Sequence, residues 1–290
     1  MLLLATSTNP HATAFPMVRT QLASFLDRFD FARAIVNFYR QPPPSQLALH
    51  ASVVLVSNVT GFKTKFWKRV LTPARTAAFE LVWLVDDDMA VGDPRFNFTR
   101  LLELREQTNV SLIAPSPSGP GRGMWNADEG RGRPLLRGCA VRLHATVELK
   151  APLFTEHAWE IVHSVVLQRL PDRTLVGPMI DLYWCGLLEE REMGCDAHLR
   201  KDRNASCWPG IGRACAYSYA TPLAHLDHKT LEKDFGMGKN ATTSREQYNV
   251  RVVQAALARA GLRKYFWAQP SWRPRGTALQ SPRQGCAARS

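Results

Sequence analysis

The stretch that decides the fold is Glu80–Val91, ELVWLVDDDMAV, in which an apolar run leads directly into three consecutive carboxylates. Leu81–Val85 predicts a strand that is buried on both faces, because its apolar residues follow one another without alternation. Successive strand side chains point to opposite faces, so Asp86 and Asp88 are expected to share a face while Asp87 points away. Two unpaired carboxylates would raise each other's pKa. A divalent cation between them would remove that penalty.

The residues before this stretch alternate between strand-like and helix-like patterns. Strands are predicted over residues 1–7, 34–39 and 51–56, and helices around residues 18–26 and over residues 63–70. This order predicts an α/β fold with a Rossmann-like, mostly parallel sheet flanked by helices. In such sheets ligands bind beyond the carboxyl ends of the strands, which is where the acidic triplet would lie.

The second half of the chain is less regular. Residues 115–134 are rich in Gly, Pro and Arg, and they predict either a lid over a phosphate-bearing ligand or a variable surface loop. A strand is expected over residues 146–153, followed by a helix over residues 155–170 with Thr155 as its N-cap. Asp181 follows a Gly-Pro turn at the start of another apolar helical stretch.

We therefore expect one domain with two halves. Residues 1–114 would bind a nucleotide sugar, and residues 115–240 would form the acceptor and catalytic half. Residues 241–290 would form a helix that ends at Gly261, followed by a disordered tail from Pro270.

Composition and charge narrow the classes of partner. The chain has 290 residues, of which 45% are hydrophobic and 21% charged, as in folded proteins. Its formal net charge of +12 favours acidic partners such as nucleotides and phosphates. The basic residues are scattered rather than interleaved with aromatic residues on one element, so no nucleic-acid partner is expected. No apolar run reaches the roughly 18 residues that span a bilayer, so no membrane anchor is expected in this chain.

Two features predict an oxidising, glycosylating compartment such as the lumen of the endoplasmic reticulum or Golgi. Five acceptor motifs for N-glycosylation begin at Asn58, Asn97, Asn109, Asn204 and Asn240. About one would be expected by chance. The six cysteines are an even number, which suits disulfides, and the sequence leaves their pairing open. No signal segment is recognisable at the start of the chain.

The acidic triplet permits three interpretations. In the favoured one, Asp86 and Asp88 bind Mn²⁺ or Mg²⁺, which holds the diphosphate of a nucleotide sugar. Another carboxylate would deprotonate an acceptor hydroxyl, for example on a glycan, as in a glycosyltransferase of the GT-A type. In the second, Asp86 is the nucleophile and Asp88 the general acid of a haloacid dehalogenase-like phosphatase. That family normally carries its motif on the first strand. In the third, the triplet is a structural turn or calcium site in a non-catalytic carbohydrate-binding protein.

Four segments in this order resemble a plant and algal family of uncharacterised proteins: KTKFWKRVLTP from Lys63, VWLVDDDMAV from Val82, VELKAPLFTEHAW from Val147 and LVGPMIDLYWC from Leu175. The family is labelled as related to lysine-ketoglutarate reductase trans-splicing, and its members look like GT-A glycosyltransferases. Its strand end reads more like Asp-Glu-Asp, so this chain departs at the middle position, Asp87. The resemblance covers roughly residues 50–235 and implies a GT-A fold and reaction class without an established substrate.

The resemblance also implies roles for residues beyond the triplet. By position, Asp181 matches the catalytic acid that GT-A enzymes often carry near a helix start, and Glu148 is a rival base or an acceptor-binding group. His225 matches the late histidine that completes the metal site in such enzymes, and His228 is an alternative. A helix cap for Asp181 and a structural imidazole for His225 are the non-functional alternatives. The expected metal ligands are Asp86, Asp88 and His225.

Overall fold

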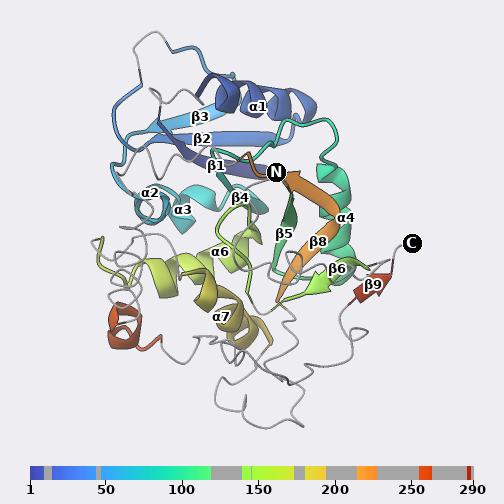
Figure 1. Ribbon diagram of the computed structural model, residues 1–290. Helices are drawn as coiled ribbons and strands as arrows, with labels where there is room; N and C mark the ends of the chain where they lie inside the picture. The colour runs from blue at the N-terminus through green and yellow to red at the C-terminus, as the bar shows by residue number, and fades with distance from the viewer. Residues whose placement is uncertain are drawn as a thin grey trace, which may run out of the picture.

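The computed structural model describes residues 1–9, 15–43, 47–118, 139–144, 146–172, 180–193, 214–226, 255–262 and 286–288. These residues form one nine-stranded sheet in the order β3-β2-β1-β4-β7-β5-β8-β6-β9, with helices packed on it (Figure 1). The strands are β1 Leu2–Thr8, β2 Ala32–Phe38, β3 Val53–Ser57, β4 Leu81–Asp86, β5 Leu112–Ser118, β6 Cys139–Leu143, β7 Leu153–Thr155, β8 Cys215–Ala224 and β9 Cys286–Ala288. The helices are α1 Phe15–Arg28, α2 Lys63–Val70, α3 Pro73–Thr76, α4 Phe98–Thr108, α6 Glu156–Val162 and α7 Asp181–Met193, and a π-helical segment, η1 His163–Leu167, continues α6.

The first half of the sheet has the predicted topology. β1 pairs in parallel with both β2 and β4, and β2 pairs in parallel with β3. Among the nine described strands, β6 and β7 run against the other seven. The predicted α/β fold with a mostly parallel sheet flanked by helices is therefore confirmed. The acidic triplet lies at the carboxyl end of β4, near the middle of this sheet.

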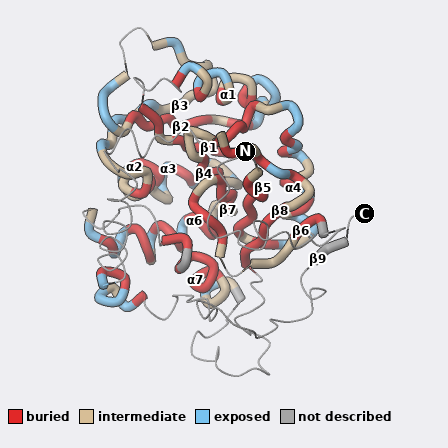
Figure 2. The backbone as a smooth tube through the Cα atoms, viewed as in Figure 1, coloured by how far each residue is buried: buried red, intermediate tan, exposed pale blue. Residues whose placement is uncertain are grey.

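Alternation along the strands separates two cores. Val82 and Leu84 pack with residues of α2, α6 and α7 on one face of the sheet. Trp83 and Val85 pack with residues of α1 and α4 on the other face. β4 is covered on both faces, as its unbroken apolar run predicts. Figure 2 shows the buried strands lying between these two groups of helices.

The strand predicted over residues 146–153 is wrong in most of its length, because only Leu153–Thr155 forms a strand. Residues 149 and 150 form a turn, and Pro152 has no backbone N–H to give to a ladder. The preceding loop nevertheless bonds to β4, since the carbonyls of Lys150 and Pro152 accept from the N–H groups of Asp86 and Leu84 at 2.8 and 3.0 Å. This loop is thereby fixed beside the end of β4.

The helix expected after Thr155 is confirmed at its start. The Thr155 hydroxyl accepts a hydrogen bond from the Ala158 N–H at 3.1 Å, which is an N-cap. The change to π-helical geometry at His163 is not foreseen by the sequence pattern.

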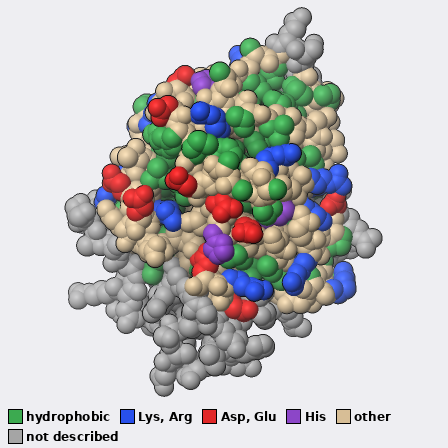
Figure 3. Space-filling view, turned by 180° about the vertical axis from the view of Figure 1, so that it is seen from behind, with side chains coloured by type: hydrophobic (Ala, Val, Ile, Leu, Met, Phe, Trp, Pro, Cys, Tyr) green, Lys and Arg blue, Asp and Glu red, His purple; other side chains and the backbone are tan. Residues whose placement is uncertain are grey.

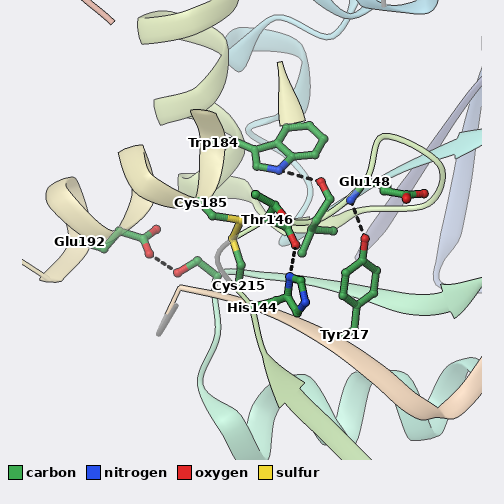
Figure 4. Close-up of a disulfide and its surroundings, with 10 residues drawn as sticks. His144, Thr146, Glu148, Trp184, Cys185, Glu192, Cys215 and Tyr217 are labelled. Atoms are coloured by element: carbon green, nitrogen blue, oxygen red, sulfur yellow. Dashed lines mark hydrogen bonds between the residues drawn. A yellow bond between two sulfur atoms is a disulfide. The ribbon is translucent and has the colours of Figure 1, made fainter. Parts of the chain in front are cut away.

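A disulfide joins Cys185 of α7 to Cys215 at the start of β8, with 5.7 Å between the two Cα atoms (Figure 4). Both cysteines are completely buried, so the bond lies in the core between the helix and the sheet. The expectation of a disulfide is confirmed for this pair. Cys195 and Cys207 lie outside the described residues.

Other expectations fall on parts of the chain that the structure describes only in part. Residues 119–138, most of the proposed lid, lie outside the described residues.

Gly261 has a left-handed φ of +72°, and the Leu262 N–H bonds to the Leu257 carbonyl at 2.8 Å, as at a glycine-capped helix end. Of the tail after Pro270, the structure describes Cys286–Ala288, which forms β9, a strand that the sequence analysis does not expect. Within the described residues, no helix combines the length and apolar character needed to cross a membrane.

Candidate functional site

The acidic triplet straddles the end of β4. Asp86 is the last strand residue, while Asp87 and Asp88 lie in a turn in which the Met89 N–H donates to the Asp86 carbonyl at 3.2 Å. The strand alternation therefore applies to Asp86 but not to Asp88, whose position is set by the turn. The two outer carboxylates have different partners.

His225 meets Asp88 at the end of β8. Its Nε2 lies 2.8 Å from Asp88 Oδ2, and the two side chains are only 11% and 15% exposed. The backbone holds this contact from two sides: the His225 N–H donates to the Ser118 carbonyl at 2.7 Å, and the Leu226 N–H donates to the Asp88 carbonyl at 2.8 Å. An antiparallel bridge joins His225 to Met89. The predicted convergence of His225 on the triplet is therefore present, and His228 lies outside the described residues.

Lys63 is a member of the site that the sequence analysis does not identify. Its Nζ forms an ion pair with Asp86 Oδ1 and donates to the Leu149 carbonyl at 3.1 Å. Lys63 is the first residue of α2, which follows β3 in the chain. A helix that begins just after a parallel strand starts at the carboxyl edge of the sheet, and this was the signal available in the sequence. Figure 3 shows acidic and histidine side chains next to one another near the middle of one face.

Glu148 and Asp181, the two candidate catalytic carboxylates, both lie near Tyr217 of β8. The Glu148 N–H donates to the Tyr217 hydroxyl at 2.7 Å (Figure 4). Burial raises the pKa of Tyr217 well above its usual value, and the charges of Glu148 and Asp181 raise it further. Both carboxylates are buried, at 8% and 9% exposed. The structure therefore brings together the two residues that the sequence analysis treats as rivals.

The Glu148 side chain is incompletely paired. Its Oε2 lies 3.8 Å from Lys150 Nζ, and its Oε1 is buried with no hydrogen-bond partner among the described residues. A buried carboxylate oxygen without a donor is costly, because it has lost water and gained nothing in return. An oxygen in this state is suited to accept a hydrogen bond from a ligand hydroxyl.

The surroundings shift the pKa values of the three aspartates in different ways. Burial raises the pKa of Asp86, although the charge of Lys63 opposes this effect. Burial also raises the pKa of Asp87, to about 7, with further contributions from the charges of Asp88 and Asp86. Burial acts in the same direction on Asp88, but the hydrogen bond and charge of His225 outweigh it and lower the pKa of Asp88. Each outer carboxylate is thus compensated by one basic side chain.

The donor set suits a hard divalent cation in its chemistry, since carboxylate oxygens and an imidazole are ligands of Mn²⁺ and Mg²⁺. The ion pairs run through Asp86 Oδ1 to Lys63 and through Asp88 Oδ2 to His225. Over the described ranges, however, no three His, Cys, Asp or Glu side chains gather closely enough to hold a metal ion by themselves. The residues fit a metal that takes few protein ligands and completes its shell with substrate oxygens.

Comparison with known proteins gives a distant likeness in fold. No protein-family model matches the sequence, and no curated protein matches it. A mycobacterial protein of known structure has a TM-score of 0.47 at 14% identity, over 90% of this chain and 75% of that chain. Glucosyl-3-phosphoglycerate synthase from Mycobacterium tuberculosis, solved with Mn²⁺, UDP-glucose and phosphoglyceric acid, has a TM-score of 0.43 at 16% identity, over 90% and 80% of the two chains. TarS from Staphylococcus aureus has a TM-score of 0.42 at 10% identity, over 89% and 71%.

Another similar structure, from Desulfovibrio desulfuricans, is described as a putative nucleotide-diphospho-sugar transferase. At TM-scores below 0.5 these likenesses do not establish an activity for this chain. The resemblance to the plant and algal family finds no support in these comparisons.

The raised pKa of Asp87 predicts a pH-dependent stability difference between the protein and Asp87→Asn. Between about pH 4 and pH 7 the folded state holds a proton on Asp87 that the unfolded chain has lost, so the contribution of Asp87 to stability falls as pH rises through this window. The asparagine has no such dependence. Thermal unfolding from pH 4 to pH 8 should show the midpoint of Asp87→Asn rising relative to the parent and levelling off above pH 7.

Asp93→Asn is the control for this comparison, because the hydrogen bond from Arg95 lowers the pKa of the Asp93 carboxyl instead of raising it. A difference between Asp87→Asn and the parent that stays constant with pH would show that Asp87 titrates as in the unfolded chain.

Proposed function

We propose that the chain is a metal-dependent glycosyltransferase of the GT-A type, which transfers a sugar from a nucleotide sugar to a hydroxyl group of an acceptor such as a glycan. The observation that supports this most is the contact of His225 with Asp88, two residues after Asp86, at the carboxyl edge of a mostly parallel sheet. That edge is where nucleotides bind in such sheets. Oxygen ligands and an imidazole suit a metal that binds a diphosphate.

The roles divide between the two halves of the chain. Residues 1–114 would bind the nucleotide sugar through the end of β4, and residues 115–240 would supply the acceptor side and His225. The boundary falls inside β5, so both halves share one sheet. When bound, Mn²⁺ or Mg²⁺ would stabilise the negative charge that develops on the departing nucleoside diphosphate. Asp86, Asp88 and His225 would hold the metal, and Asp87 would contribute to the electrostatics of the donor site.

The acceptor hydroxyl needs a base, and we assign this role to Asp181, with Glu148 as the rival. Asp181 is the first residue of α7 and is buried, near Tyr217. Glu148 has a buried oxygen without a partner in the described chain, which suits a hydrogen bond from a sugar hydroxyl. The unpartnered oxygen favours Glu148 for binding the acceptor. The resemblance to GT-A enzymes favours Asp181 for accepting the proton of the acceptor hydroxyl.

We further propose that the protein works in the lumen of the secretory pathway. Asn58, Asn97 and Asn109, the three acceptor asparagines in the described residues, are all exposed. Asn97 caps α4 through its side-chain oxygen, which accepts from the Arg100 N–H at 2.9 Å, and a glycan on its nitrogen would leave that bond intact. The buried disulfide between Cys185 and Cys215 suits the same oxidising environment.

Calorimetric titration with UDP and with GDP, in the presence and absence of Mn²⁺, tests the proposed function. Metal-dependent binding of one nucleoside diphosphate is expected, and Asp86→Asn or Asp88→Asn should weaken it by about a hundredfold or more, as loss of a charge-assisted metal or hydrogen-bond contact costs a few kcal/mol. Asp93→Asn, which changes a partly buried aspartate paired with Arg95 on the same connection, is the control and should bind normally.

Phosphate release from generic phosphomonoesters without nucleotide binding would instead support the phosphatase interpretation. Binding of free glycans with neither activity would support the carbohydrate-binding one.

The assignment of the base predicts different kinetics for Asp181→Asn and Glu148→Gln. Loss of a general base costs about 10²- to 10⁴-fold in turnover. We expect this loss in Asp181→Asn with unchanged binding of the nucleoside diphosphate, whereas Glu148→Gln should mainly raise the KM for the acceptor. Steady-state kinetics with varied acceptor would reveal the reverse pattern if Glu148 is the base.

The compartment can be tested by expressing the chain behind a secretion signal in a eukaryotic cell. Treatment with an N-glycosidase should increase its gel mobility, and replacing Asn58, Asn97 and Asn109 by Gln should reduce the shift. An unchanged mobility of the secreted protein would contradict the proposal.

A further inference from the structure

The Asp86 carboxylate is already paired with a cationic side chain of the protein, that of Lys63. Lys63 Nζ pairs with Asp86 Oδ1, and the two side chains are only 24% and 21% exposed. The same nitrogen donates to the Leu149 carbonyl at 3.1 Å and lies 5.6 Å from the centre of the Trp67 ring. Three different elements therefore define the position of this ammonium group at the carboxylate that the proposed metal would use.

The helix that carries Lys63 is firmly held. Phe66 and Trp67 of α2 are buried in the core. Lys68 Nζ donates to the Leu170 carbonyl at 2.7 Å, and His163 Nε2 lies 3.0 Å from the Lys68 carbonyl. The backbone at Lys63 is thus anchored to α6 and η1, so a change at Asp86 would be made by the flexible four-carbon side chain of Lys63.

A divalent cation and the Lys63 ammonium group compete for the same carboxylate. A protonated lysine has no lone pair with which to bind a metal. Repulsion between a unit charge and a double charge a few ångströms apart is strong where solvent is partly excluded. His225 differs in this respect, because a neutral imidazole can be a ligand. The lack of a ready three-ligand cluster in the described chain agrees with carboxylates that are arranged around the protein's own cations.

We infer that Lys63 is a positioning residue that keeps Asp86 from binding a divalent metal until the diphosphate of the nucleotide arrives. This inference rests on the proposed function. Lysine has three N–H donors, of which Asp86 and the Leu149 carbonyl take two in the described structure. The third can donate to a phosphate oxygen, and a diphosphate carries more negative charge than one carboxylate, so the incoming diphosphate draws Lys63 from Asp86 and leaves this carboxylate to the metal. Metal and nucleotide then bind together, and metal alone binds weakly.

Titration of the nucleotide-free protein with Mn²⁺, followed by the electron paramagnetic resonance signal of free Mn²⁺, tests this inference. Lys63→Met should bind Mn²⁺ at least about tenfold more tightly than the parent, because the competing charge is gone. Lys65→Met is the matched control, since it removes the same charge from the same helix and Lys65 has no ion pair with the triplet. UDP should tighten Mn²⁺ binding much more in the parent than in Lys63→Met.

The effect must pass through Asp86. In an Asp86→Asn background, replacing Lys63 by Met should raise the residual Mn²⁺ affinity by much less than the roughly tenfold expected in the parent, because only the direct repulsion between the two cations is then removed. Lys63→Gln repeats the test with a polar side chain in case Lys63→Met folds poorly, which circular dichroism would show. A merely structural role for Lys63 would weaken Mn²⁺ binding or leave it as it is.

The outcomes separate the inference from the proposed function. If the parent binds Mn²⁺ with UDP, but Lys63→Met and Lys63→Gln bind Mn²⁺ alone no more tightly than the parent, the inference is wrong and the function stands. If the parent binds no Mn²⁺ under either condition and Lys63→Met gains Mn²⁺ binding, the inference holds without the function. If neither protein binds Mn²⁺, both are wrong.

Discussion

The site depends on the backbone contact between the end of β4 and the end of β8. The N–H groups of Ala90 and Leu226 donate to the carbonyls of Ala224 and Asp88, at 2.9 and 2.8 Å, and so join two segments far apart in the sequence. Backbone groups provide this register, so it does not depend on the charge of any side chain. The contact of His225 with Asp88 follows from it. Without this register Asp88 would lose the hydrogen bond and charge of His225, which lower its pKa against the effect of burial.

The disulfide between Cys185 and Cys215 links the two candidate bases, Asp181 and Glu148, to the sheet. On α7, Asp181 and Cys185 are four residues apart, so they lie on the same side of the helix. On β8, Cys215 and Tyr217 are two residues apart and point to the same face of the sheet. The covalent bond between the cysteines therefore brings Asp181 toward Tyr217. Tyr217 in turn holds the backbone of Glu148. One crosslink thus fixes both candidate bases relative to the strand that carries His225.

The sequence predicts the parts of this arrangement that local patterns determine. The unbroken apolar run identifies β4, and the expected helix over residues 63–70 agrees with α2 at both ends. His225 was named from the resemblance to GT-A enzymes, and the structure places it against Asp88. The strand expected over residues 146–153 is wrong because an apolar pattern does not show that the chain turns at residues 149 and 150. The start of α2 after β3 predicts that Lys63 lies at the carboxyl edge of the sheet, but its contact with Asp86 depends on the pairing of strands that no local pattern shows.

The three aspartates of the triplet are not equivalent, because contacts with distant elements give each carboxyl different surroundings. Asp86 and Asp88 each have a basic partner, Lys63 and His225, whereas neither of these forms an ion pair with Asp87 in the described structure. The pKa of Asp87 is raised to about 7 by burial and by its two neighbours, so near neutral pH this carboxyl is protonated for part of the time. Partial protonation reduces the repulsion that Asp87 exerts on both sides. The turn can therefore hold Asp86 and Asp88 beside their basic partners with less repulsion from the residue between them.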